Sequence, residues 1–525
     1  MDSSIVRKDV RVQRRYLMML LMALVFLVSV WVRLHALGGT SIWSDEAFTL
    51  ILSSYSPSQI IFHTAQDVHP PLYYLALHAW MMVFGNGVFS ARSLSVVAGC
   101  LTVMMGMWWL LLISTKRAAI LGGVMLALLP MAVRYSQEIR MYSLFALFMM
   151  GATVALVYWV NGVHRKPAIV VYTLLMAAGL YTHYFAAVCM ASHWVYLLIL
   201  MFWRDTRYKY FFAVDWWLAN LAIVCIFIAW VPSLLHQLKF SGFNWVAMPG
   251  IHAVVSAVWV FLNYTDGLMF AAWAYYSLPV VFVVMSFVVV AQDKSKKGSS
   301  ALLVIYTWFP LLLIVVVSFF YPLFVDRYFI FAAMGLPMVL AIALDNFMVR
   351  KVSGCYLVFL LIVILEVVGV GNVYRRGHAV YDEVNRMDVL SAYLNEYAGS
   401  DDGVLVTNGF LYFPFVYYNS TTIAPKLYTP PKRDGTSGRP EGYQIWTLVQ
   451  NEADNIYMDN FECMNSKSGR IWVLGTDLRG SKGTVFPQNW RLIRTFIAGD
   501  AQVQLFETGS LDSKRIFSTC LTPTS

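Results

Sequence analysis

Two adjacent carboxylates, Asp45 and Glu46, stand in the stretch SIWSDEAFTL between Trp43 and Phe48. On a helix, neighbouring side chains diverge by about 100°, so one carboxylate can face a cavity while the other anchors the segment. A carboxylate beside aromatic side chains in a partly dry cleft suits general-base chemistry, because desolvation brings its pKa towards the working pH. The alternative is a solvated turn or a helix N-terminus, which gives the pair no chemical role.

Polar residues of other types recur at the ends of apolar segments. His69 stands near Asp67 and before two prolines that fix the local backbone. Arg134 is spaced to pair with Glu138, which leaves Arg140 to meet an anion. Ionisable groups at a hydrocarbon boundary are costly unless they pair or line a wet cavity, so these residues form a candidate site. Its other members are Arg92, Gln137, Tyr142, His183, Arg327 and Tyr328.

These residues also have purely structural interpretations. An interfacial arginine such as Arg140 can extend to lipid head groups. Asp326 can neutralise its neighbour Arg327, and a lone histidine such as His69 or His183 is more often packed than catalytic. The chemical interpretation therefore depends on whether the topology gathers these groups on one side of a membrane.

The composition predicts a polytopic membrane protein. Of the 525 residues, 59% are hydrophobic and only 13% are charged, and the mean hydropathy is +0.62. The formal net charge of +9 comes mostly from short Lys and Arg clusters between apolar segments. We expect topology to explain these clusters, and we expect membrane lipids but no nucleic acid as partners.

Eleven apolar segments approach the roughly 20 residues that a membrane span needs. A further segment, residues 70–85, is short and opens with two prolines. If it lies along the outer interface as an amphipathic helix, the basic N-terminus and the basic loops fall on the inner side, as the positive-inside rule requires. The predicted spans are residues 16–37, 92–113, 117–133, 143–162, 168–184, 185–203, 212–234, 272–291, 301–321, 328–346 and 354–373.

An odd number of spans starting in the cytoplasm ends outside it. Residues 1–373 are therefore predicted to be a transmembrane domain, and residues 374–525 an extracytoplasmic α/β domain. In this second domain DGVLVTNG and GRIWVLGT are typical of short buried strands, and residues 490–508 predict a hairpin with its turn at AGD. The Pro- and Gly-rich residues 425–442 predict a mobile loop. Cys463 and Cys520 are the two cysteines outside apolar segments, and they could pair.

With this topology the polar clusters share the outer face, and there the sequence resembles the GT-C membrane glycosyltransferases. The similar branch contains the protein O-mannosyltransferases and the lipid A aminoarabinose transferases. The resemblance rests on an ordered set of motifs over roughly residues 16–345. They are the pair Asp45 and Glu46, the stretch DVHPPL, Arg92 at the start of a span, the Gln137, Glu138, Arg140 and Tyr142 segment, and the late pair Arg327 and Tyr328.

The resemblance implies an all-α membrane domain of GT-C type with interfacial helices in the first outer loop. It also implies a mannosyltransferase-like enzyme that moves a hexosyl or pentosyl group from a polyprenyl-phosphate donor, usually with inversion. The acceptor would be a hydroxyl or phosphate of a lipid, glycan or protein at the outer face of the inner or plasma membrane. Asp45 would be the base and Glu46 its support.

The donor phosphate would bind Arg92, Arg140 and Arg327, and His69 could also donate to it. The cavity would be completed by the remaining members of the set, namely Asp67, Arg134, Gln137, Glu138, Tyr142, His183 and Tyr328. This division is chemically sensible, because a leaving phosphate needs fixed cations and the attacking oxygen needs a nearby base.

No P-loop, GxGxxG, HExxH or CxxC motif occurs, so no cofactor and no metal ligand is assigned, and a divalent-metal requirement stays open. Two other hypotheses compete with an enzyme: a transporter or flippase of a lipid-linked sugar, and a structural scaffold. Transporters tend to contain repeats and helices broken at the midplane. This chain shows no repeat, and a scaffold does not explain three outer arginines beside a carboxylate pair.

Overall fold

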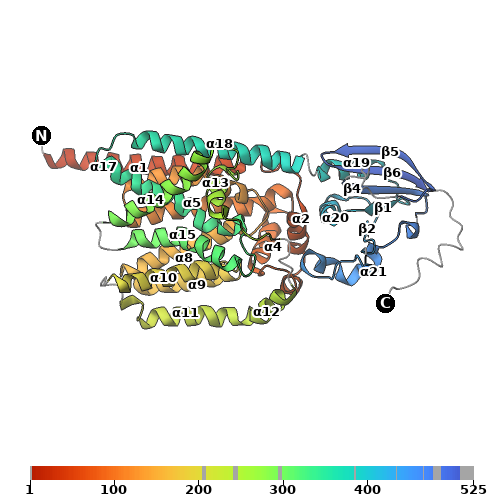
Figure 1. Cartoon of the computed structure of the whole chain (residues 1–525), viewed down its shortest axis with the longest axis horizontal. Coiled ribbons are helices and arrows are strands. Elements are labelled where there is room, and N and C mark those ends of the chain that lie inside the picture. The colour runs from red at the N-terminus through yellow and green to blue at the C-terminus, as the bar shows by residue number, and fades with distance from the viewer. Residues whose placement is uncertain are drawn as a thin grey trace. The chain divides into compact units, whose positions relative to one another are not determined.

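The computed structural model describes residues 3–203, 209–240, 246–293, 298–382, 386–432, 434–464, 466–476 and 486–508. The chain is mostly helical, with one small sheet near its C-terminal end (Figure 1). It forms two compact units. The first contains Met1–Leu37 and His69–Tyr374, and the second contains Gly38–Val68 and Arg375–Ser525. The later junction, between Tyr374 and Arg375, adjoins the predicted domain boundary.

The first unit makes this chain a multi-pass membrane protein. In the described residues eight helices are long and apolar enough to cross a membrane, or nine if the bent pair α6 and α7 is one span. They begin with α1 (Ser3–Leu34), α5 (Val88–Ile113), α6 (Lys116–Leu128) with α7 (Pro130–Ser136), and α8 (Tyr142–Val160). They continue with α11 (Val214–Phe227) through η2 (Ile228–Trp230) into α12 (Val231–Phe240), α14 (Ala272–Ala291), α15 (Ser299–Ser318), η4 (Asp326–Phe329) through α16 (Ile330–Ala333) into α17 (Gly335–Val349), and α18 (Cys355–Asp382).

The predicted count of eleven spans is not confirmed. Helices α9 (Arg165–Leu180) and α10 (Ala186–Phe202) occur at two of the predicted positions, but they contain only 16 and 17 residues. The all-α polytopic fold class is confirmed, because every predicted span coincides with a helix. Helix α13 (Ala253–Asn263), which lies between α12 and α14, was not predicted.

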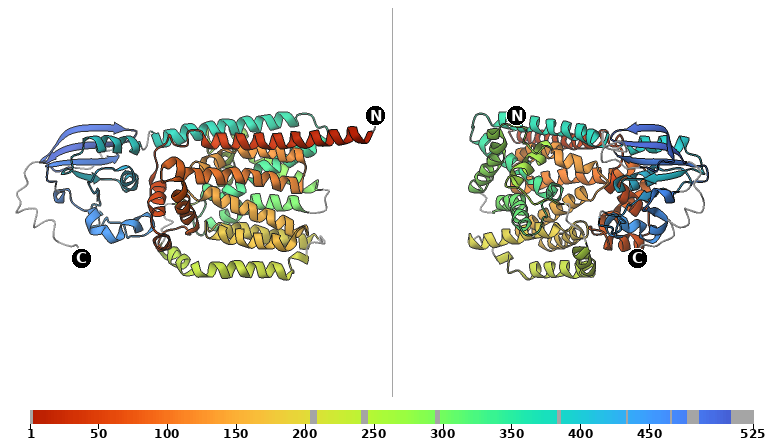
Figure 2. Two further views of the ribbon diagram at one scale, coloured as in Figure 1. Left: turned by 180° about the vertical axis from the view of Figure 1, so that it is seen from behind. Right: turned by 45° about the vertical axis from the view of Figure 1, so that its right-hand side comes forward.

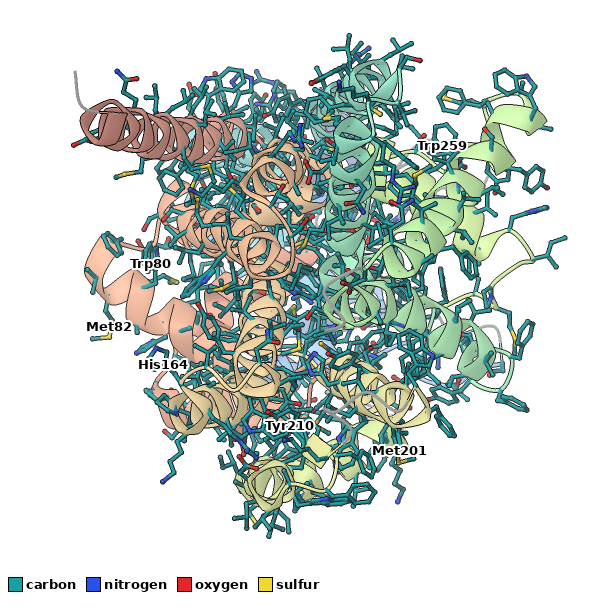
Figure 3. The ribbon with its side chains drawn as sticks, turned by 90° about the vertical axis from the view of Figure 1, so that its left-hand side faces the viewer. Trp80, Met82, His164, Met201, Tyr210 and Trp259 are labelled. Atoms are coloured by element: carbon teal, nitrogen blue, oxygen red, sulfur yellow. The ribbon has the colours of Figure 1, made fainter. Side chains whose placement is uncertain are left out.

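Helix α4 (Leu72–Phe84) occupies most of residues 70–85, which the charge pattern assigned to the outer interface and not to a membrane span. Its 13 residues rise about 20 Å, too short for a bilayer core of about 30 Å. Met82 is 76% exposed and points away from the bundle in Figure 3, and Val83 is 73% exposed. Both features suit a short helix in contact with lipid, and its location at the outer interface stays a prediction.

The first and last long helices of the membrane unit, α1 and α18, lie side by side in two opposite views (Figures 1 and 2). Val32 of α1 and Val370 of α18 belong to one apolar cluster with Val133 of α7. The hydroxyl of Tyr374 donates a 2.5 Å hydrogen bond to the carbonyl oxygen of Val32. The C-terminal end of α1 is therefore fixed by elements from two distant parts of the chain, α7 and α18.

The second unit contains a six-stranded mixed sheet in the order β3-β2-β1-β4-β6-β5. Strands β1, β2, β3 and β4 pair in parallel, and β4, β6 and β5 pair antiparallel. Helices α19, α20 and α21, with the 3-10 turns η5 and η6, connect or flank the strands (Figure 1). Their bounds are α19 (Met387–Tyr397), β1 (Gly403–Val406), α20 (Gly409–Tyr418), β2 (Lys426–Tyr428), η5 (Gln444–Glu452), α21 (Ala453–Ile456), β3 (Tyr457–Met458), η6 (Phe461–Cys463), β4 (Arg470–Thr476), β5 (Trp490–Ala498) and β6 (Ala501–Thr508).

The predicted α/β character of this part of the chain is confirmed. The two predicted strands are β1 and β4, and the predicted hairpin is β5 and β6, whose turn contains Gly499 at φ +67°. The interpretation of residues 425–442 as a loop is wrong at its start, because β2 forms there by parallel pairing with β1. Cys463 is disulfide-bonded, and Cys520 lies outside the described residues.

The segment 38–68 belongs to the second unit although it is distant in sequence from the rest of it. It contains α2 (Ser44–Ser53) and α3 (Pro57–Ala65). Helix α2 packs against α20. This segment carries the Asp45 and Glu46 pair.

Candidate active site

A break between α6 and α7 brings the polar residues 134–142 into place. Pro130 has no N–H, so it interrupts the helix, and the two pieces meet at 55°. The fully buried Arg33 of α1 stabilises the break by donating to the freed carbonyl oxygens of Ala127 at 2.9 Å and Leu126 at 3.5 Å. Its Nε also donates to Ser136 Oγ at 3.2 Å. One arginine therefore fixes both sides of the break.

Gln137 follows α7 and holds the end of α1. Its Nε2 donates to the carbonyl oxygens of His35 at 2.9 Å and Arg33 at 3.1 Å, with a longer contact of 3.5 Å to Val32. The last carbonyls of a helix have no partner within the helix, so this amide satisfies several of them. Gln137 thus has a structural task in this arrangement, and its predicted place in a substrate cavity stays a prediction.

Arg134 and Glu138 form the ion pair that their spacing predicts, with 2.5 Å between guanidinium nitrogen and carboxylate oxygen. The pair does not lie along a continuous helix, because α7 ends at Ser136. Arg134 Nε also donates to the hydroxyl of Tyr264 at 3.1 Å. Arg134 is therefore held from two directions.

Tyr264 is a member of the site that the sequence did not indicate. It ends α13 in the left-handed backbone conformation, φ +56°, which is unfavourable for a bulky residue. The neighbouring Asn263 fixes this turn. Its side-chain amide donates to the carbonyl oxygen of Leu365, and its backbone carbonyl oxygen accepts from the side-chain amide of Asn372. The polar run NYTDG at residues 263–267 signals a turn, but nothing in it indicates Arg134 as a partner.

His183 is the centre of an aromatic cluster in the turn between α9 and α10. Its ring centroid lies 4.7 Å from that of Tyr328, 5.8 Å from that of His69 and 6.1 Å from that of Tyr142. The main chain fixes this turn as well, because the N–H of Leu72 donates to the carbonyl oxygen of Tyr181. Four predicted site residues from distant segments therefore lie together.

Two of the predicted phosphate-binding arginines act on the same histidine. His183 is buried, and the positive charges of His69, Arg140 and Arg327 all act on its ring. Arg140 and Arg327 come from segments far apart in sequence, and both lie close enough to His183 to influence its charge.

Arg92, near the start of α5, is buried and donates to the carbonyl oxygen of Leu37 at 2.8 Å. One turn later, Ser95 donates to the carbonyl oxygen of Arg140 at 3.3 Å and contacts the hydroxyl of Tyr73 at 3.2 Å. Helix α5 thus connects directly to the segment that carries Arg140. The predicted role of Arg92 in phosphate binding stays a prediction.

The predicted carboxylates belong to the second unit. Asp45 and Glu46 lie in the first turn of α2, where a negative charge favours the positive end of the helix dipole. Glu46 is buried, and the hydroxyl of Thr49 donates to the carbonyl oxygen of Asp45 at 2.6 Å. Asp67 is buried just after α3. Their predicted meeting with the arginines of the first unit stays a prediction.

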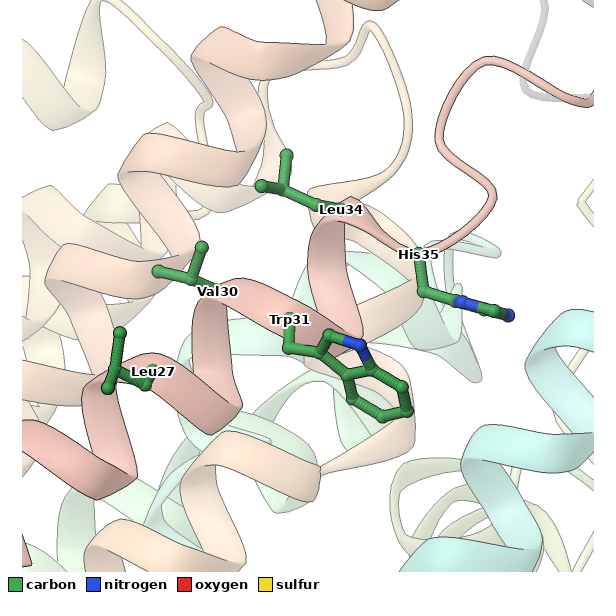
Figure 4. A pocket seen from close by; sticks show the side chains of 5 residues that line it. All are labelled: Leu27, Val30, Trp31, Leu34 and His35. Carbon is green, nitrogen blue, oxygen red and sulfur yellow. The ribbon is translucent and has the colours of Figure 1, made fainter.

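An apolar pocket of about 530 Å³ lies on one exposed face of α1 (Figure 4). Trp31 and Leu27 in its lining are 65% and 61% exposed. None of its lining residues is a predicted site residue, so it does not mark the candidate active site. The lining consists of Leu27, Val30, Trp31, Leu34 and His35.

Metal ligands do not cluster in the part of the chain that the structure describes. No three His, Cys, Asp or Glu residues gather there closely enough to hold an ion. The candidate site in the first unit instead combines guanidinium groups with imidazole and phenol groups. Such groups bind an anion, and guanidinium is suited to phosphate because it can donate two parallel hydrogen bonds.

Comparison with known proteins identifies the fold. No protein-family model and no curated protein matches the sequence. Among solved structures, ArnT from Cupriavidus metallidurans is similar over 92% of this chain and 97% of its own, with a TM-score of 0.61 at 12% identity. The same enzyme bound to undecaprenyl phosphate gives a TM-score of 0.57 at 13% identity, with the same coverage.

The oligosaccharyltransferase of Archaeoglobus fulgidus, in a complex with zinc and sulfate, is also similar. It gives a TM-score of 0.52 at 10% identity and covers 87% of this chain and 68% of its own. These proteins share the GT-C fold, so this chain has a GT-C fold, as the resemblance of its motifs implies. The near-complete coverage of ArnT extends the similarity beyond the membrane unit to the C-terminal unit.

Proposed function

We propose that this protein is a glycosyltransferase that moves a sugar from a polyprenyl-phosphate donor to an acceptor at the outer face of the membrane. The observation that carries the proposal is the cluster of His69, Tyr142 and Tyr328 around His183, with the guanidinium of Arg327 over the Tyr328 ring, in a chain with a GT-C fold. Undecaprenyl phosphate occurs in the similar ArnT structure, which supports a lipid-linked donor. A transporter or flippase is not favoured, because the similar structures are glycosyltransferases.

In this proposal the arginines bind the phosphate that becomes the leaving group. The bond between the sugar C1 and the phosphate oxygen breaks, and polyprenyl phosphate departs with the electron pair. Arg92, Arg140 and Arg327 stabilise its growing negative charge, and His69 donates a further hydrogen bond. Fixed cations suit this task because they need no reorganisation as the charge develops.

The acceptor attacks C1 from the opposite face, which inverts the configuration there. Asp45 takes the proton of the acceptor hydroxyl as the new bond between oxygen and C1 forms, and Glu46 supports it. Asp67, Arg134, Glu138, Tyr142 and Tyr328, with Gln137 and His183, line the cavity for the sugar and the acceptor. The donor carries a hexosyl or pentosyl group, and the acceptor is a lipid, a glycan or a protein.

The orientation of the chain belongs to the same proposal. The protein spans the inner or plasma membrane. Its N-terminus lies in the cytoplasm, and its C-terminal unit lies outside the cytoplasm. The disulfide at Cys463 supports this orientation, because disulfides persist in oxidising compartments.

Asp45→Asn tests the chemistry directly. The purified variant, assayed with undecaprenyl-phosphate-linked sugars offered one at a time, should lose about 10²-fold or more of its turnover while still binding donor. Asp401→Asn, which changes an exposed carboxylate in the same unit, is the matched control and should keep full turnover. Full activity of Asp45→Asn would remove Asp45 as the base.

A further inference from the structure

We infer that the C-terminal domain (residues 386–508) holds the segment 38–68 and fixes the start of α2, with Tyr418 and Thr447 as positioning residues. The consequence for turnover rests on the proposed function, because α2 carries Asp45. The inference that the domain holds this segment does not depend on any activity.

The two helices of this segment are too short to be stable on their own. Helices α2 and α3 have ten and nine residues, and isolated helices shorter than about 12–15 residues are marginal in water. The N-cap of α2 is Trp43, whose side chain makes no capping hydrogen bond to the helix N-terminus. The start of α2 therefore depends on contacts from outside the segment.

The C-terminal domain supplies contacts at the beginning of the segment. The N–H of Ile42 donates to the hydroxyl of Tyr418 at 3.2 Å, three residues before Asp45. The neighbouring Ser41 accepts a hydrogen bond of 3.3 Å from the N–H of Asp388 in the first turn of α19. Both contacts come immediately before α2, where displacement of the chain would move the carboxylate pair.

A second pair of contacts lies at the other end of the segment. His63 Nδ1 lies 3.0 Å from the hydroxyl of Thr447 in η5, and the N–H of Gln444 donates to the carbonyl oxygen of Gln66 at 3.1 Å. Gln444 adopts φ +57° there, a strained conformation that persists only where its surroundings fix it. Both ends of the segment are thus bound to one support.

Tyr418 is itself held in place by contacts within the C-terminal domain. Tyr418 ends α20, and its carbonyl oxygen accepts from the side chain of Asn395 in α19. Tyr393 of α19 stacks on Phe496 of β5 with 4.1 Å between the ring centroids. A chain of contacts therefore joins the sheet to the residue before α2, which gives the C-terminal domain a definite task.

Tyr418→Phe tests the inference because it removes the hydroxyl and keeps the ring. In the full-length protein in nanodiscs, hydrogen exchange at the amides of residues 42–48 should become about fivefold faster, as expected for the loss of one hydrogen bond. Exchange in α5 and α8 should not change. Adding Thr447→Val should also accelerate exchange in α3.

Tyr393→Phe is the matched control, because its hydroxyl accepts from Arg494 within the same domain. It should leave exchange at residues 42–48 unchanged. If exchange there is also unchanged in Tyr418→Phe and in the double variant, the inference is wrong. Melting temperatures close to that of the parent protein show that each variant is folded.

Turnover separates this inference from the proposed function. If Asp45 is the base, Tyr418→Phe should lower kcat about fivefold and leave KM for the polyprenyl-phosphate donor unchanged. Faster exchange with unchanged kcat still supports the domain as the holder of α2, and it counts against Asp45 as the base. A KM effect without faster exchange would contradict the positioning role.

Discussion

Arg33 on α1 donates a 2.9 Å hydrogen bond to the carbonyl oxygen of Ala127, close to the point where Pro130 ends α6. The guanidinium also lies 3.5 Å from the carbonyl oxygen of Leu126, whose helical partner would be the N–H that Pro130 lacks. The same arginine reaches Ser136, the last residue of α7, immediately before the segment that contains Glu138 and Arg140. The geometry of the candidate site therefore depends on a residue outside it.

Arg33→Met should destabilise the membrane unit. The substitution leaves the carbonyl oxygens of Ala127 and Leu126 buried without this donor, at a cost of about 2 kcal/mol or more. Thermal unfolding of the purified protein in detergent should show a lower melting temperature. Arg375→Met, at an exposed arginine, is the control and should have little effect. Equal melting temperatures for both variants would show that Arg33 does not stabilise the break.

Tyr264→Phe should lower the glycosyltransferase activity without unfolding the protein. It removes the hydroxyl that accepts from Arg134 Nε, so the guanidinium loses this contact and keeps its ion pair with Glu138. We expect kcat/KM to fall about tenfold in an assay with undecaprenyl-phosphate-linked sugars. Tyr275→Phe is the control, because its hydroxyl, on α14, contacts the hydroxyl of Ser256 on α13. A normal kcat/KM in Tyr264→Phe would exclude a role for this contact in the reaction.

The orientation of the chain can be tested by labelling in intact cells. A cysteine replacing exposed Lys116, the first residue of α6, should resist a membrane-impermeant maleimide, and one replacing exposed Lys432 in the C-terminal unit should react. Both should react after the cells are opened, which controls for accessibility. The opposite pattern would invert the predicted topology.

Local patterns predicted the elements that local interactions decide. The continuous apolar runs and flanking glycines of β1 and β4 are sufficient to predict those strands, and the β5 and β6 hairpin needs only its two strands and the turn at Gly499. The pair of Arg134 and Glu138 likewise follows from a spacing of four residues. The three residues of β2 gave no such signal, because their strand conformation depends on pairing with β1.

Contacts between distant segments were beyond the reach of these patterns. Tyr264 meets Arg134 across 130 residues of sequence, and Gln137 binds the end of α1 across about 100. The residue type does not indicate the partner in either case, because a tyrosine or glutamine side chain can form a hydrogen bond with almost any polar group. The grouping of residues 38–68 with the C-terminal domain was hidden for the same reason, since its hydrogen bonds join residues more than 300 positions apart.

The attachment of the segment 38–68 should weaken in mild acid. Burial lowers the pKa of His63 below its ordinary value of 6.5, and an interaction with the backbone of Thr447 opposes this effect only in part. The folded state therefore binds a proton less readily than the unfolded state, so stability is full above pH 6.5 and is lost as the pH falls below it. Hydrogen exchange in α3 should accelerate between pH 7 and pH 5, after correction for the intrinsic rate. His63→Gln should remove this pH dependence, and an equal dependence in both proteins would exclude His63 as its source.

Glu366 in α18 should be replaceable by leucine with a gain in stability. It is fully buried, and within the described residues neither carboxyl oxygen has a hydrogen-bond partner. It lies on the buried stripe of α18 with Ile362 and Val370, and burying such a polar group costs about 1–3 kcal/mol. Glu366→Leu should therefore raise the melting temperature. Asn372→Leu should lower it, because Asn372 donates to Asn263. A lower melting temperature for Glu366→Leu would mean that the carboxyl stabilises the fold, and a loss of turnover in a stable Glu366→Leu protein would assign the carboxyl to the reaction.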